Sequence, residues 1–155
     1  EPSGVAWRLG LLASVEDADL DGAVLEMIRW HERAHLVDSF YFLPIGSNLW
    51  RIIGLLFGNG FSRSELEGEL EARAETTALA YSAHPRLVLA HIATFLEGDP
   101  ESSPHARGFR ALAERVMIEL RALGVSEQGS HPRRWHTLDP RLARAAGKAL
   151  AGRLW

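Results

Sequence analysis

The segment "RWHERAHLVD", residues 29–38, contains a His-Glu-x-x-His pattern formed by His31, Glu32 and His35. On a helix, two histidines four residues apart lie on one face about one turn apart, so both imidazoles can bind the same zinc ion. The glutamate that follows the first histidine then lies beside the metal, where it can accept a proton from a zinc-bound water. The pattern therefore predicts a zinc site with Glu32 as the general base, provided that the segment is helical.

The sequence around this pattern has the periodicity of a helix. No glycine or proline occurs between Gly22 and Pro44, and apolar residues recur at steps of three and four in phase with the two histidines. We therefore expect a helix from about Asp21 to Pro44. An unpaired charge on an apolar stripe is costly, which favours metal binding over two solvated histidines on an exposed face.

A catalytic zinc site usually has three protein ligands and one open position, so a third ligand must come from elsewhere in the chain. The extended pattern HExxHxxGxxH does not supply it, because position 38 is Asp and position 41 is Tyr. We expect Asp38, three residues after His35, to support a ligand rather than to bind the metal. The better candidate is "ELEARAE", residues 69–75, on a second predicted helix that starts at Ser62 or Ser64.

Together, the two segments resemble the glutamate-zincin metallopeptidases, in which HExxH is completed by a downstream helix reading E-x-x-A-D or a close variant. "EARAE", residues 71–75, matches with Glu in place of the final Asp. The resemblance covers the two motif helices and implies that Glu71 is the third zinc ligand. It also implies that Glu75 orients a ligand histidine, a role that ligand histidines usually need filled. The implied activity is hydrolysis of peptide or protein substrates, with zinc as the cofactor and Glu32 as the base.

The same residues have plainer interpretations. Runs of glutamate are usually solvated helix faces, and this helix carries five of them (Glu65, Glu67, Glu69, Glu71 and Glu75). Two features of the family are not evident: a substrate-binding sheet before HExxH, for which only residues 1–30 are available, and a His or Tyr that stabilises the oxyanion. Residues 5–13 are a candidate strand or short helix. Tyr81, His84 and His91 are nominated for the oxyanion role only by their place in the chain, and a capping or core role is the stronger expectation for both histidines.

The remaining chain predicts a mainly α fold with little or no β-sheet. Further helices are expected over residues 48–57, 85–98 and 106–124 and from Pro140 to about Leu150, with polar connectors at 99–106 and 125–140. We expect one zincin-like helical domain over residues 1–155, complete or part of a longer chain. Its essential elements are the HExxH helix and the second, Glu-bearing helix.

The longest apolar stretch, residues 40–61, is interrupted by Pro44, Arg51 and several glycines, which is not typical of a transmembrane helix. We expect most of its apolar side chains to be covered by the last three helices, and part of the stretch to wall the zinc cleft. No signal peptide is visible in the chain, which leaves the location open with a cytoplasmic one favoured.

Composition and charge limit the classes of partner and the residues that can bind a metal. A net charge of −3 and a pI near 6.2 provide no basic surface for nucleic acid. Cysteine is absent, so any metal must be bound by His, Asp or Glu. The oligomeric state is not predicted by any pattern.

Two other functions fit parts of the pattern. "ERAH", residues 32–35, is also Glu-x-x-His, as in ferritin-like di-iron carboxylate proteins, but that architecture needs two such motifs and the chain has no second one. The other is a non-catalytic helical interaction module, either a degenerate zincin or a chance motif. The presence of Glu32 favours catalysis, because a purely structural site would not need that residue.

Overall fold

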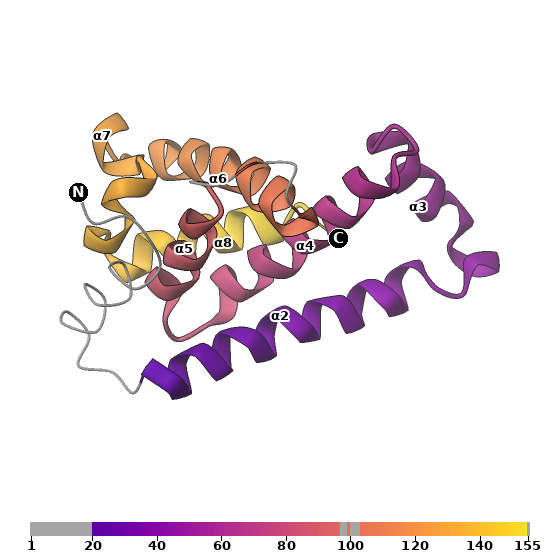
Figure 1. The fold of residues 1–155 in the computed structure, drawn as a ribbon, viewed down its shortest axis with the longest axis horizontal. Helices are drawn as coiled ribbons and strands as arrows, with labels where there is room; N and C mark the ends of the chain where they lie inside the picture. The colour runs from indigo at the N-terminus through magenta and orange to yellow at the C-terminus, as the bar shows by residue number, and fades with distance from the viewer. Residues whose placement is uncertain (1–19, 97–98, 100–102, 155) are drawn as a thin grey trace.

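The computed structural model of the chain describes residues 20–96, 99 and 103–154. These residues form helices and no β-strand, which confirms the expected mainly α fold for this part of the chain (Figure 1). Residues 5–13, the candidate strand or short helix, lie outside the described residues. The helices are α2 (Leu20–Phe42), α3 (Ile45–Gly58), α4 (Arg63–Tyr81), α5 (Pro85–Thr94), α6 (Pro104–Ala122), α7 (Glu127–Ser130), the 3-10 helix η1 (Pro132–Thr137) and α8 (Pro140–Ala151).

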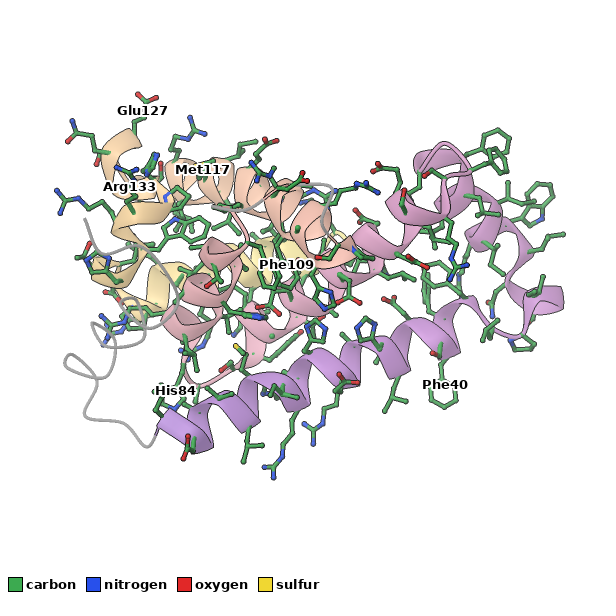
Figure 2. The ribbon with its side chains drawn as sticks, viewed as in Figure 1. Phe40, His84, Phe109, Met117, Glu127 and Arg133 are labelled. Atoms are coloured by element: carbon green, nitrogen blue, oxygen red, sulfur yellow. The ribbon has the colours of Figure 1, made fainter. Side chains whose placement is uncertain are left out.

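Helix α4 is the element around which the others pack, since α2, α5, α6 and α8 all contact it. Its buried positions are mostly small, including Ala72, Ala74 and Ala78, so neighbouring helices can approach its backbone closely. The larger core side chains come from the surrounding helices, and Phe109 of α6 lies among them, away from solvent (Figure 2). The second motif helix is thus the centre of the fold rather than a solvated surface element.

Two glycines fix how closely α6 and α8 cross α4. A Cβ at Gly108 of α6 would overlap the backbone of Gly68 in α4. A Cβ at Gly147 of α8 would lie 2.7 Å from the backbone nitrogen of Ala80. Larger residues at either position would push these helices away from α4, so the glycines set the distance at which side chains of α6 face those of α4.

Helix α6 starts earlier than the sequence predicted. Ser103 caps it by accepting a hydrogen bond from the backbone nitrogen of Ala106 at 3.1 Å, and Pro104 occupies the first turn, where its missing N–H costs nothing. The expected loop over residues 99–106 is therefore partly helical, and His105 lies in the first turn of α6.

Helix α3 differs most from expectation. None of its residues is buried, and the helix packs mainly against α2 at one end of the molecule (Figure 1). Phe40 and Trp50 are 82% and 81% exposed, and Phe40 points away from the bundle (Figure 2). The prediction that the last three helices cover residues 40–61 is wrong. Helices α6 and α8 pack on α4 and on each other, whereas α3 contacts mainly α2.

No single helix in the described part of the chain is long and apolar enough to cross a membrane. Helices α2 and α3 reach that length and composition only as a pair, and the pair is bent by 112°.

Candidate metal centre

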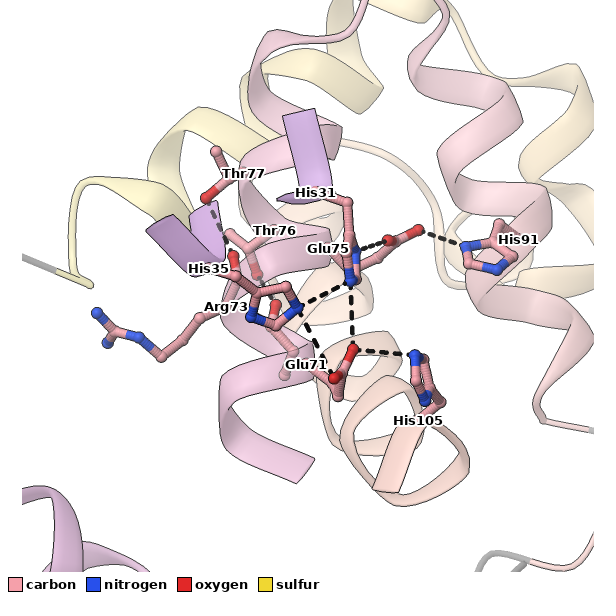
Figure 3. A network of polar contacts seen from close by, with 10 residues as sticks. His31, His35, Glu71, Arg73, Glu75, Thr76, Thr77, His91 and His105 are labelled. Atoms are coloured by element: carbon pink, nitrogen blue, oxygen red, sulfur yellow. Dashed lines mark hydrogen bonds and ion pairs between the residues drawn. The ribbon is translucent and has the colours of Figure 1, made fainter. Parts of the chain in front are cut away.

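Histidines of α2 and glutamates of α4 meet where the two helices pack side by side (Figure 3). His31 Nε2 lies 3.2 Å from Glu71 Oε2, and His35 Nε2 lies 3.1 Å from His31 Nε2 and 3.7 Å from Glu71 Oε1. The i, i+4 spacing in α2 and the register of α4 therefore bring together the three residues that the sequence nominated as ligands.

The contacts around Glu71 have the geometry of ligands that share a central ion. Its buried Oε2 atom forms ion pairs with His31 Nε2 and His105 Nε2 at 3.2 Å and 3.0 Å, but neither contact has the alignment of a hydrogen bond. The nitrogens and the oxygen are close to one another without being aligned as donor and acceptor. Tetrahedral zinc with bonds of about 2.0–2.1 Å separates its ligand atoms by about 3.3–3.4 Å, which is near these spacings. The donor set thus fits a metal ion.

His105 was not nominated from the sequence, yet it joins this cluster from the start of α6. His31, Glu71 and His105 each offer one ligand atom, and these atoms all lie within 4.8 Å of one another. The imidazoles of His31 and His105 are nearly parallel, with ring centroids 6.4 Å apart. The Ser103–Pro104 pair is a helix-start signal that could have placed His105 in a first turn. Nothing local indicates that this turn faces α2.

Glu75 stabilises the cluster by accepting hydrogen bonds from two imidazoles. It is fully buried, and its two oxygens accept hydrogen bonds from His31 Nδ1 at 2.9 Å and His91 Nδ1 at 2.8 Å (Figure 3). A proton held on Nδ1 leaves the Nε2 lone pair of a neutral imidazole free for a metal. Glu75 therefore both orients His31 and selects the tautomer that a ligand requires.

The charges of the cluster are strongly coupled. Burial alone would lower the pKa of His31, but Glu71 and Glu75 raise it to about 9. Burial alone would raise the pKa of Glu71 and of Glu75, yet the neighbouring histidines hold both below their usual range. Without a metal, a protonated His31 therefore neutralises part of the charge of the two carboxylates.

A cleft of about 310 Å³ opens beside the cluster. Its lining combines the polar residues His31, Glu32, Glu75, His91 and His105 with Met27, Ile28 and Phe95. Glu32 is exposed and follows His31 directly in α2. The nominated base therefore lies at a solvent-accessible cleft next to the nominated ligands. No residue of 40–61 lines this cleft, but Ile52 and Leu56 of that stretch help to line a second groove that includes the nominated ligand His35.

Asp38 does not have the supporting role expected of it. Both of its oxygens accept hydrogen bonds from the Arg73 guanidinium, at 2.8–3.3 Å, and both side chains are buried. A buried carboxylate is most strongly stabilised by a bidentate cation, and Arg73 supplies one from the face of α4 next to the glutamates. Asp38 therefore joins α2 to α4 instead of orienting a metal ligand.

The other nominated residues are divided between the cluster and the surface. Glu65, Glu67 and Glu69 each pair with an arginine, Glu69 with Arg115 at 2.8 Å. Tyr81 stacks on Trp30, 5.3 Å between centroids, and lines a different hollow. His84 occupies the N-cap position of α5. Of the three nominees for the oxyanion role, the structure brings His91 to the cleft.

Comparisons with known proteins found no matching family model, no matching curated protein and no matching solved structure. Imidazole and carboxylate donors suit zinc, but also other first-row ions, so the donor set indicates a metal without identifying it.

Proposed function

We propose that this chain is a zinc-dependent hydrolase that cleaves peptide bonds, with His31, His35 and Glu71 as ligands and Glu32 as the general base. The observation that carries the proposal is the convergence of imidazole nitrogens on Glu71: His31 Nε2 and His105 Nε2 lie within 3.2 Å of its buried Oε2 as ion-pair partners, without the alignment of a hydrogen bond, and His35 Nε2 lies 3.7 Å from Oε1. The geometry supports metal-assisted hydrolysis, and the choice of a peptide substrate rests on the resemblance to the glutamate zincins.

Each residue then has a distinct role. Zinc, when bound, supplies a polarised substrate carbonyl and a water of lowered pKa. Glu32 takes the proton from the attacking water and returns it to the leaving amine. Glu75 keeps the Nδ1 proton on His31 and holds His91 at the cleft through a second hydrogen bond of 2.8 Å. His91 and His105 also line the cleft and are the candidates to contact a substrate oxygen.

His105 also supports a second candidate, a structural metal site in a non-catalytic helical protein. With His105 added to the three nominated ligands, the site has four protein donors and no open position, as structural zinc sites do. Replacement of His105 by Ala separates the two functions. A catalytic site keeps its zinc through the other three ligands and loses hydrolysis, whereas a closed structural site loses most of its zinc affinity.

The di-iron alternative has less support. Only two carboxylates, Glu71 and Glu75, belong to the cluster in the described part of the chain, and both oxygens of Glu75 are used by imidazole Nδ1 atoms. Ferritin-like sites use four glutamates and two histidines.

The test is hydrolysis by the zinc-loaded chain of a mixture of unstructured peptides, followed by mass spectrometry. We expect cleavage that stops with a chelator and returns with zinc. Glu32→Gln should keep the zinc and lower the rate by about 10²–10⁴-fold, the usual contribution of a general base. The proposal fails if the zinc-loaded wild type cuts no peptide bond, or if Glu32→Gln is as fast as the wild type.

A further inference from the structure

Exposed large apolar side chains lie mainly on α2 and on the segment that follows it. We call residues 43–61, which comprise α3 and the turns on both sides of it, the apolar arm. In the described chain, the exposed large hydrophobic residues outside α2 and this arm are Tyr81, Ile118 and Leu123. Those on the arm are each at least 46% exposed: Leu43, Ile45, Leu49, Trp50, Phe57 and Phe61. Side chains project from this end of the molecule without neighbours from the bundle (Figure 2).

The apolar side chains lie on several sides of the arm's helix. Between Leu49 and Phe57, only Arg51 and Gly54 are not large and apolar. Ile52 and Leu56 turn toward α2 and α4, while Trp50 and Phe57 remain exposed. A helix that is apolar on most of its circumference belongs in a protein core or in lipid.

The charge pattern also favours lipid. From Ser39 to Ser62, the only charged residue is Arg51. Its guanidinium stacks 4.1 Å from the ring centroid of Tyr41, so its aliphatic stem can lie along apolar surface while its head stays in water. Exposed Trp and a flexible cation are typical of segments at the boundary between headgroups and acyl chains.

We propose that the apolar arm docks on the surface of a lipid bilayer, with Trp50 and Phe57 in the boundary between headgroups and acyl chains. An apolar groove of about 370 Å³ lies between the arm, α2 and α4, and His35 is among its lining residues. Docking of the arm therefore brings the groove, and with it a proposed zinc ligand, close to the membrane surface. This last link rests on the proposed function, and its consequence is that substrates with apolar segments at the membrane are favoured. The docking itself does not depend on the metal.

The test is flotation of the full chain with vesicles of phosphatidylcholine alone. Because the chain has a net charge of −3, binding must be driven by apolar area, so it should persist when salt is raised. The double variant Trp50→Glu/Phe57→Glu should lower the bound fraction about tenfold or more. The matched control is Ile118→Glu/Leu123→Glu, which places the same two charges at apolar residues 58% and 42% exposed at the end of α6 and should bind like the wild type.

Two results would overturn the proposal. One is a wild type that does not float with the vesicles, and the other is a double variant that floats as well as the wild type. A wild type that is dimeric by light scattering, does not bind vesicles and becomes monomeric in the double variant would assign the arm to a second copy of the chain. Zinc content measured on the same samples keeps the proposals distinct. Vesicle binding without zinc contradicts only the hydrolase, and zinc without vesicle binding contradicts only the docking.

Discussion

The carboxylate of Glu75 lies 2.9 Å from Nδ1 of His31, although the two residues belong to different helices and Glu75 is wholly buried. This contact fixes which nitrogen of His31 faces Glu71. A buried acid is stable only when its oxygens are satisfied, and here the donors are two imidazoles, of His31 and His91. The need to satisfy a buried group and the need to orient a ligand are thus met by the same hydrogen bonds.

Replacement of Glu75 by Ala should therefore weaken zinc binding by about 10–100-fold, the usual effect of losing a residue that orients a ligand histidine. Glu75→Gln is the milder variant, because its carbonyl oxygen can still accept from one imidazole. Competition with a zinc chelator measures both affinities. An affinity of Glu75→Ala equal to that of the wild type would mean that the orientation of His31 does not depend on this contact.

Glu71 and Glu69 lie two residues apart on α4 and make a matched pair. Glu71→Ala removes a proposed ligand and should lower zinc affinity severely. Glu69→Ala should leave it unchanged, because Glu69 faces α6 and pairs with Arg115 at 2.8 Å. Zinc titration of the two variants, with circular dichroism to verify folding, measures the difference. Loss of zinc from Glu69→Ala and not from Glu71→Ala would contradict the assigned register of the helix.

The sequence could predict one face of the site because its signal is local: the i, i+4 spacing places His31 and His35 on the same side of a helix. The choice of Glu71 and Glu75 in "EARAE" as their partners came from the resemblance to the glutamate zincins, since no local signal shows which helices pack together. His105 could not be found in this way, since its place depends on how closely α6 crosses α4 at Gly68 and Gly108. Similarly, the apolar residues of α3 indicated burial, but nothing in that stretch indicates which element would cover it.

Asp38 is another residue whose contact, with Arg73, the sequence did not predict, and it yields a third prediction. Breaking its buried ion pair with Arg73 removes a charge partner from a buried cation, and loss of one member of such a pair typically costs about 3–5 kcal/mol. Asp38→Ala should lower the free energy of unfolding by this order, while the folded fraction keeps the zinc affinity of the wild type. Urea unfolding and chelator competition measure the two quantities. A variant with normal stability and weakened zinc binding would restore Asp38 to the supporting role expected from the sequence.

Zinc affinity should also depend on pH in a way set by His31. Its pKa in the metal-free protein is raised from 6.5 to about 9, so below pH 9 zinc must displace a proton from this residue. Affinity should therefore rise by about tenfold per pH unit between 7 and 9. The stability that the charged His31 gives the metal-free protein has the opposite dependence. It is fully present below pH 6.5 and is lost as pH rises through about 9. A chelator competition that is flat from pH 7 to 9 would contradict this charge state.

The most direct test of the metal centre is elemental analysis of the purified full chain after equilibration with zinc, iron and manganese together. The proposed ligand set predicts one zinc per chain, and less than a tenth of that amount in the His31→Ala/Glu71→Ala double variant if both ligands are lost together. Two irons per chain would favour the di-iron alternative instead. No bound metal in a folded wild type would show that the imidazoles and carboxylates of α2 and α4 are only a buried polar network, and the proposed hydrolase would then be wrong.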